Sequence, residues 1–288
     1  ALTAAHQMMK HGGKRALGLA HSVAWERTQQ ADCVGMAWVV EHLRTRTFFD
    51  DAARMGRELL GDNPARWGEF GVVPGLEGQL ALRERGALYG GVSGVYTATG
   101  WGMDAAGSNF GDNHVGEWTL EDAYAGWASG EMFPSLGTNA IDLSIGAQKY
   151  QVGSGFLVSD GGTDGGERGG YWIGLRKAFR FTAIAKLRTG PWLVEGVFFR
   201  PNDDKNTSTK TVGANVEYAF GETGALAGSY WNVYASDDER RDGLNIFDVR
   251  GEVRPASSLP GLLLEGELTY ERNGSGSLNN SWGGFGGI

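Results

Sequence analysis

An all-β fold, built from antiparallel strands that run up and down in chain order, is predicted by three features of the sequence. Between residues 178 and 272, segments of about ten residues alternate apolar and polar side chains, which is the period of a β-strand. The connections between these segments are short and long in turn, and aromatic residues lie near the segment ends. All three features are typical of a transmembrane β-barrel, whose tilted strands cross the bilayer.

The alternation also predicts which side chains face lipid. In residues 210–220, Val212 and Val216 alternate with Asn215 and Glu217. The residues expected to face lipid are Phe179, Phe181, Leu187, Val212, Val216, Val249, Val253, Leu264 and Leu268. A water-soluble β-sandwich alternates in the same way, so a soluble extracytoplasmic carbohydrate-binding β-sandwich remains the alternative.

Earlier strands have a weaker pattern. They are expected at residues 36–49, 76–85, 87–101, 117–129 and 139–151. Residues 50–70 and the glycine-rich end from residue 273 are expected to be connections. About eleven strands result, whereas bacterial single-chain barrels have an even number and must close, because unpaired backbone groups in lipid cost several kcal/mol each. We therefore expect residues 36–288 to form an incomplete barrel.

The first 35 residues do not fit the strand pattern. From Met9, basic residues precede a short apolar stretch, as in a secretory signal peptide, but His21 and the polar residues after it interrupt that stretch. Residues 1–35 are thus expected to be a leader-like or a disordered segment.

Composition excludes several classes of protein. The 48 glycines have no three-residue period, which excludes collagen. A single cysteine, Cys33, argues against a disulfide scaffold and against a cysteine-rich zinc site. The net charge of -8 argues against a nucleic-acid-binding protein. No apolar window approaches the ~18 residues of a membrane-spanning helix.

Motifs for catalysis are missing from the sequence. The five histidines show no paired metal-ligand spacing, and neither a GxSxG motif nor a Walker lysine occurs. Glu121 and Asp122 could serve a glycosidase only if both carboxyls faced one side, and adjacent strand residues point to opposite faces. We therefore expect no catalytic residue, no cofactor and no metal, and an enzyme ranks behind both a channel and a carbohydrate-binding protein.

Basic side chains recur at positions expected to face the interior. They are Arg44, Arg46, Arg180, Lys186, Arg188, Arg250 and Arg254. Rings of arginine and lysine are a means by which pores select anions. The alternative is that these cations pair with inward-facing glutamates across strands and only satisfy a polar interior.

Residues 120–127 (LEDAYAGW), 143–161 (LSIGAQKYQVGSGFLVSDG) and 168–179 (RGGYWIGLRKAF) together resemble the alginate-export family of outer-membrane porins. The resemblance implies a barrel in the bacterial outer membrane, in contact with its lipid. It also implies an arginine-lined lumen that passes an anionic polysaccharide or another anionic solute by passive diffusion. Among the arginines, only Arg168 and Arg176 lie within the matching motifs, and the resemblance implies that they line this path.

The longest glycine-rich stretch, residues 153–177, is expected to fold inward as a constriction or a lid. Its arginines and its aromatic residues Phe156, Tyr171 and Trp172 differ from the acidic loops elsewhere, and long loops of this kind are often functional. Asp160, Asp164 and Glu167 in this stretch could form a calcium loop. Their spacing fits no defined motif, and an ordinary solvated loop is the favoured interpretation.

Overall fold

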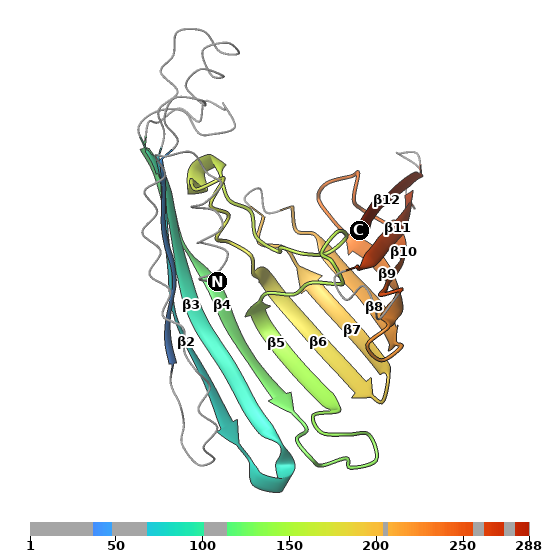
Figure 1. The fold of residues 1–288 in the computed structure, drawn as a ribbon. Helices are drawn as coiled ribbons and strands as arrows, with labels where there is room; N and C mark the ends of the chain where they lie inside the picture. Colours follow the sequence, from blue (N-terminus) through green and yellow to red (C-terminus); the bar gives the residue numbers. More distant parts are fainter. Residues whose placement is uncertain are drawn as a thin grey trace.

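Twelve strands form one antiparallel sheet in the computed structural model (Figure 1). The structure describes residues 37–47, 68–100, 114–203, 207–255, 262–273 and 280–287. Each strand pairs with its neighbours in the sequence, from β1 to β12. Within these described ranges, β1 and β12 do not pair with each other. The predicted up-and-down antiparallel fold is confirmed, and the sheet is open.

The strands are β1 (Ala37–Thr47), β2 (Gly68–Ala81), β3 (Ala87–Gly100), β4 (His114–Ala128), β5 (Ile141–Gln148), β6 (Phe179–Thr189), β7 (Trp192–Arg200), β8 (Lys210–Ala219), β9 (Gly224–Ala235), β10 (Leu244–Val253), β11 (Leu264–Asn273) and β12 (Ser281–Gly287). Two short 3-10 helices, η1 (Arg83–Arg85) and η2 (Gly166–Arg168), lie in connections. In the described part of the chain, no helix has the length and apolarity needed to cross a membrane.

The tight turns lie at one end of the sheet, and the longest connection of the described chain lies at the other end. Tight turns join β2 to β3, β6 to β7 and β8 to β9, whereas β5 is joined to β6 by residues 149–178. In the turn between β6 and β7, Gly190 has φ +53°, a conformation that glycine adopts without steric cost.

The two faces of the sheet differ in polarity. One face, called here the outer face, carries exposed large apolar side chains on strands from β2 to β12. They include Leu80, Leu88, Trp118, Leu120, Leu143, Ile145, Trp192, Val194, Val212, Val216, Leu226, Phe247, Val249, Val253, Leu268 and Trp282. The other face, the inner face, carries buried polar side chains. They include Glu69, Thr97, Glu121, Thr182, Glu195, Thr211, Asn215, Asp248, Arg250 and Glu267.

Most side chains expected to face lipid lie on the outer face, but Phe179 does not. Only 4% of Phe179 is exposed, and its ring packs against Phe199 of the inner face, 4.6 Å away between ring centroids. The register between β5 and β6 shifts where Gln148 pairs with Phe179. This irregularity breaks the alternation, so the expected outward orientation of Phe179 is wrong.

Two strand assignments also differ from the sequence prediction. β2 begins at Gly68, within the expected polar connection, and pairs with β1 and β3. β12, in the expected terminal loop, pairs with β11 over seven residues of the sequence SWGGFGG. Tyr270 and Trp282 pack across these two strands, with 4.5 Å between ring centroids. The expected leader-like segment, residues 1–35, lies outside the described residues.

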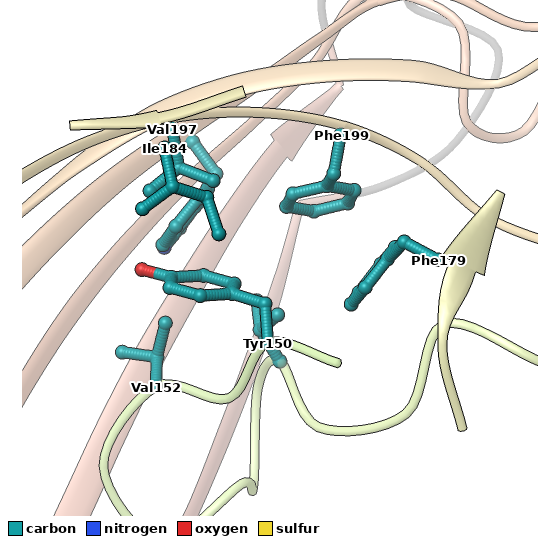
Figure 2. Close-up of a cluster of buried hydrophobic side chains, with 8 residues drawn as sticks. Tyr150, Val152, Phe179, Ile184, Val197 and Phe199 are labelled. Atoms are coloured by element: carbon teal, nitrogen blue, oxygen red, sulfur yellow. The ribbon is translucent and has the colours of Figure 1, made fainter. Parts of the chain in front are cut away.

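A buried apolar cluster lies on the inner face (Figure 2). Its members are Tyr150, Val152, Val158, Phe179, Ile184, Val197, Phe199 and Trp231. Figure 2 shows the Tyr150 ring lying between Val152 and the β6 and β7 side chains Ile184 and Val197. The cluster therefore joins the connection after β5 to the wall of the sheet.

Candidate functional site

The connection between β5 and β6, residues 149–178, is called here the crossing segment. Figure 1 shows it in yellow-green, running across the curved sheet. Its side chains and backbone contact inner-face residues from β2, near one edge of the sheet, to β12 at the other. The predicted inward folding of this connection is therefore observed, and the segment is the candidate functional element.

Two carboxylates of the wall hold the backbone of the crossing segment. Glu69 of β2 accepts the N–H groups of Trp172, at 3.0 Å, and of Ile173, at 2.9 Å. Glu121 of β4 accepts the N–H groups of Lys177, at 2.8 Å, and of Ala178, at 3.0 Å. Each carboxylate thus binds two consecutive backbone donors, an arrangement of charge-assisted hydrogen bonds.

Arg176 fixes the same end of the segment through its side chain. The guanidinium donates to Asp164 Oδ1 at 2.6 Å, to Thr119 Oγ1 at 2.9 Å, to the Glu117 carbonyl at 2.8 Å and to Thr97 Oγ1. Burial raises the pKa of the Asp164 carboxyl above its ordinary value, and the hydrogen bonds from Arg176 oppose that effect. This buried ion pair ties the segment to itself and to β3 and β4.

Arg168 of η2 is also buried and hydrogen-bonded. Its guanidinium donates to the carbonyls of Thr163 and Asn202, at 3.0 and 2.9 Å, and its Nε lies 3.3 Å from the Glu117 carboxylate. Thr97 of β3 donates to the Arg168 carbonyl at 2.8 Å. Both arginines that the resemblance implies as pore-lining are thus engaged in holding the segment.

Close approach of the segment to β3 requires glycine. Gly169 and Gly170 both have φ +67°, and a Cβ on Gly170 would lie 2.7 Å from the Thr97 Cβ. The Gly170 N–H donates to Thr99 Oγ1 at 2.8 Å. The glycine-rich composition of this stretch therefore provides a tight fit against the wall.

The other end of the segment is held mainly by apolar packing. Tyr150 packs in the buried cluster, and its hydroxyl donates to Glu195 at 3.4 Å. Burial raises the pKa of the Tyr150 hydroxyl, so it stays protonated. Ser154 donates to Glu267 of β11 at 2.9 Å. Phe156 packs on Phe285 of β12 with 5.3 Å between ring centroids.

Two of the predicted inward cations pair with acidic residues on the inner face. Arg250 is buried, with Asp248 Oδ2 at 3.0 Å and Asn215 Oδ1 at 2.6 Å. Lys186 lies 3.1 Å from Glu195. Such ion pairs are expected if the basic residues only satisfy a polar interior, which is the alternative to anion selection. Both side chains still line the inner face, and their role in solute binding stays a prediction.

The remaining predicted cations are more exposed or lie elsewhere. Arg188 is exposed near the end of β6. Arg180 is exposed at the register shift, where it lies with Phe181 opposite Ala147, so the alternation that predicted it to face the interior does not hold there. Arg254 lies just after β10, 3.8 Å from Glu252. The backbones of Arg44 and Arg46 pair with Gly71 and Glu69, and their side chains lie outside what the structure describes.

Sequence reasoning did not identify the wall carboxylates as docking groups. Glu121 and Asp122 were expected on opposite faces, but a register shift between Val92 and Gly94 of β3 places two β4 residues opposite one. Glu121 reaches the segment, and Asp122 accepts a hydrogen bond from Ser93 at 2.7 Å. The alternation argument is therefore wrong at this pair.

Two acidic residues of the segment, Asp160 and Asp164, are paired with its cations. Asp160 lies 2.8 Å from Lys177 Nζ, and Asp164 lies 2.6 Å from Arg176. Among the residues that the structure describes, no group of three or more His, Cys, Asp or Glu side chains is placed to hold a metal ion. The arrangement offers a fixed polar obstacle on the inner face, with exposed cations beside it.

Comparisons with known proteins identify no family. No family model matches the chain, and no curated protein matches it. Among solved structures, the chain is similar to a mutant of the Rh. blastica porin, with 10% identity and a TM-score of 0.40, covering 88% of this chain and 76% of that one. It is also similar to Salmonella typhi OmpF in complex with daunomycin, with 7% identity and a TM-score of 0.33, covering 76% of this chain and 77% of that one.

Proposed function

We propose that this chain forms the wall of a bacterial outer-membrane channel through which an anionic solute or an alginate-like polysaccharide diffuses passively. The observation that carries the proposal is the polarity of the sheet. Its outer face exposes large apolar side chains, and the side chains buried on its inner face are mainly polar. A transmembrane barrel has this distribution, because its outer surface meets lipid and its interior meets water.

The same polarity argues against a soluble β-sandwich. A sandwich buries its apolar face between two sheets. In the described residues, the buried side of this sheet carries glutamate, threonine and arginine beside one apolar cluster, and the larger apolar surface is exposed on the other side. An uncovered apolar face extending over many strands would promote aggregation in water. The carbohydrate-binding sandwich is therefore the weaker candidate.

Aromatic rings on the outer face support placement in a membrane. Near the short turns, Trp192 and Tyr218 pack with 4.7 Å between ring centroids. Toward the opposite end, Tyr270 packs on Trp282 at 4.5 Å. Two groups of aromatic residues at different heights correspond to the girdles found at both membrane interfaces.

The inner face supports preference for anions through its exposed cations. Arg188 is exposed, and Lys186 is partly exposed. Exposed carboxylates on the same face oppose this set, among them Glu77, Glu117, Glu252 and Glu265. The cations of β6 should affect a passing solute more strongly than these carboxylates do. The reason is that β6 directly follows the crossing segment, which narrows the space over the inner face. The resemblance of residues 120–179 to alginate-export porins agrees with an anionic solute.

Reversal potentials in a salt gradient across planar bilayers test the proposal on the full-length protein. We expect anion selectivity that decreases when Arg188 is replaced by glutamine, and that weakens at high salt because ions screen the field. As a matched control, Arg240→Gln changes an exposed cation in the connection between β9 and β10 and should leave selectivity unchanged. Cation selectivity of the unmodified channel would contradict the proposal.

A further inference from the structure

The crossing segment covers charged groups, and its central part, residues 153–177, contributes no net charge. Residues 153–177 contain three acidic residues, Asp160, Asp164 and Glu167, and three basic residues, Arg168, Arg176 and Lys177. Their formal charges sum to zero. Any effect of this stretch on ion selectivity must therefore come largely from its shape and from what it covers.

Three wall carboxylates lie beneath the segment. The exposed fractions of Glu69, Glu121 and Glu267 are 2%, 1% and 5%. Glu69 and Glu121 accept backbone N–H groups of the segment, and Glu267 accepts the Ser154 hydroxyl. Donors of this kind compensate the charge of a carboxylate, and the covering residues keep solutes away from it.

Glu265, a carboxylate that the segment leaves uncovered, can be compared with the covered Glu267 on the same face. Glu265 and Glu267 lie two residues apart on β11, and therefore on the same side of the strand. Glu265 is exposed, whereas Glu267 is buried under the segment. The negative charge that a passing solute meets is thus smaller than the negative charge that the strands carry.

We propose that the crossing segment masks the carboxylates of Glu69, Glu121 and Glu267, so that the selectivity of the channel for anions depends on a segment whose central part, residues 153–177, has no net charge. This inference rests on the proposed channel function and identifies the element that sets its selectivity. Without the segment, three ionised carboxylates would face the water-filled interior. They would attract cations and repel anions.

The first test compares two substitutions in the intact channel. Glu265→Gln should shift the reversal potential toward greater anion selectivity, because it removes an accessible negative charge. Glu267→Gln, the matched variant two residues away, should shift it several-fold less. Equal shifts for the two variants would overturn the masking, because Glu267 would then act on passing ions as strongly as its uncovered neighbour.

The second test replaces residues 153–177 with a short glycine-serine linker. We expect the anion-to-cation permeability ratio to fall several-fold, and Glu267→Gln to recover part of that loss in this background. An unchanged ratio in a folded, conducting variant would overturn the masking. If the variant does not fold, the comparison of Glu265 with Glu267 still decides the question. Failure of the proposed function is distinct, since it would show as cation selectivity of the unmodified channel.

Discussion

The carboxylate of Glu69 accepts the backbone N–H of Ile173 at 2.9 Å, across a sequence separation of 104 residues. The same carboxylate accepts the N–H of Trp172. A strand near one edge of the sheet thus fixes a connection that begins after β5, three strands later, which places the crossing segment over the inner face. The position of the segment depends on side chains of the wall more than on its own glycine-rich chain.

Replacing Glu69 with alanine should loosen the crossing segment. The substitution removes the acceptor of two N–H groups, and hydrogen bonds to charged groups contribute about 1.5–3 kcal/mol each. We expect a larger and noisier single-channel conductance, because the part of the segment near Trp172 would leave the wall. Planar-bilayer recordings of single channels measure this change.

Glu77→Ala is the control for that substitution. Glu77 lies on β2 an even number of residues from Glu69, so both side chains point to the same face of the sheet, and the Glu77 side chain is exposed. The control should conduct like the unmodified channel. Identical conductance of Glu69→Ala and Glu77→Ala would mean that the Glu69 carboxylate does not position the segment.

The strand order and most of the face assignment could be predicted from the sequence. Alternation at Val212 and Val216 is regular, and the observed outer face agrees with it. Prediction failed where a register shift interrupts the period, as at Phe179 and at the pair Glu121 and Asp122. A bulge adds one residue to a strand, and no particular residue type marks its position in the sequence. An assignment by strict alternation therefore gives the wrong face beyond the bulge.

Glycine-rich strands were missed for a related reason. β12 has four glycines in seven residues, and only Trp282 and Phe285 are large. Trp282 belongs to the outer face and Phe285 contacts Phe156 on the inner face, so no apolar alternation is visible. The docking role of Glu69 was likewise hidden, because it depends on contacts between residues far apart in the sequence.

Replacing Val216 with arginine tests the membrane placement of the outer face. Val216 lies mid-strand on β8 and is 39% exposed. An arginine near the bilayer midplane costs about 2–4 kcal/mol, and the cost falls to about 0–1 kcal/mol near the interface. We therefore expect the free energy of unfolding in lipid vesicles, measured by denaturant titration, to fall by the larger amount.

Phe220→Arg is the depth control for Val216→Arg. Phe220 is exposed in the turn between β8 and β9, where an arginine can reach the headgroups. Its loss of stability should be smaller than that of Val216→Arg. Equal, small losses at both positions would argue that Val216 faces water.

Replacing Gly213 with alanine tests the packing of the wall beneath the buried cluster. Gly213 lies on the inner side of β8, and a Cβ there would lie 2.1 Å from Trp231 Cε3 and 2.6 Å from the Tyr230 carbonyl oxygen. Trp231 is 1% exposed and packs on Phe199 and Tyr150, so its ring cannot move aside without disturbing the cluster. Overpacking of this kind costs typically about 1–3 kcal/mol.

Gly196→Ala on β7 is the matched control, because a Cβ at Gly196 would meet no atom within 4 Å. Denaturant titration in lipid vesicles should show a loss of stability for Gly213→Ala and little change for Gly196→Ala. Displacement of Trp231 would also loosen Tyr150 and the end of the crossing segment that it holds, so the single-channel conductance of Gly213→Ala should become noisier. Equal stabilities of the two variants would show that Trp231 does not lie over Gly213 in the folded protein.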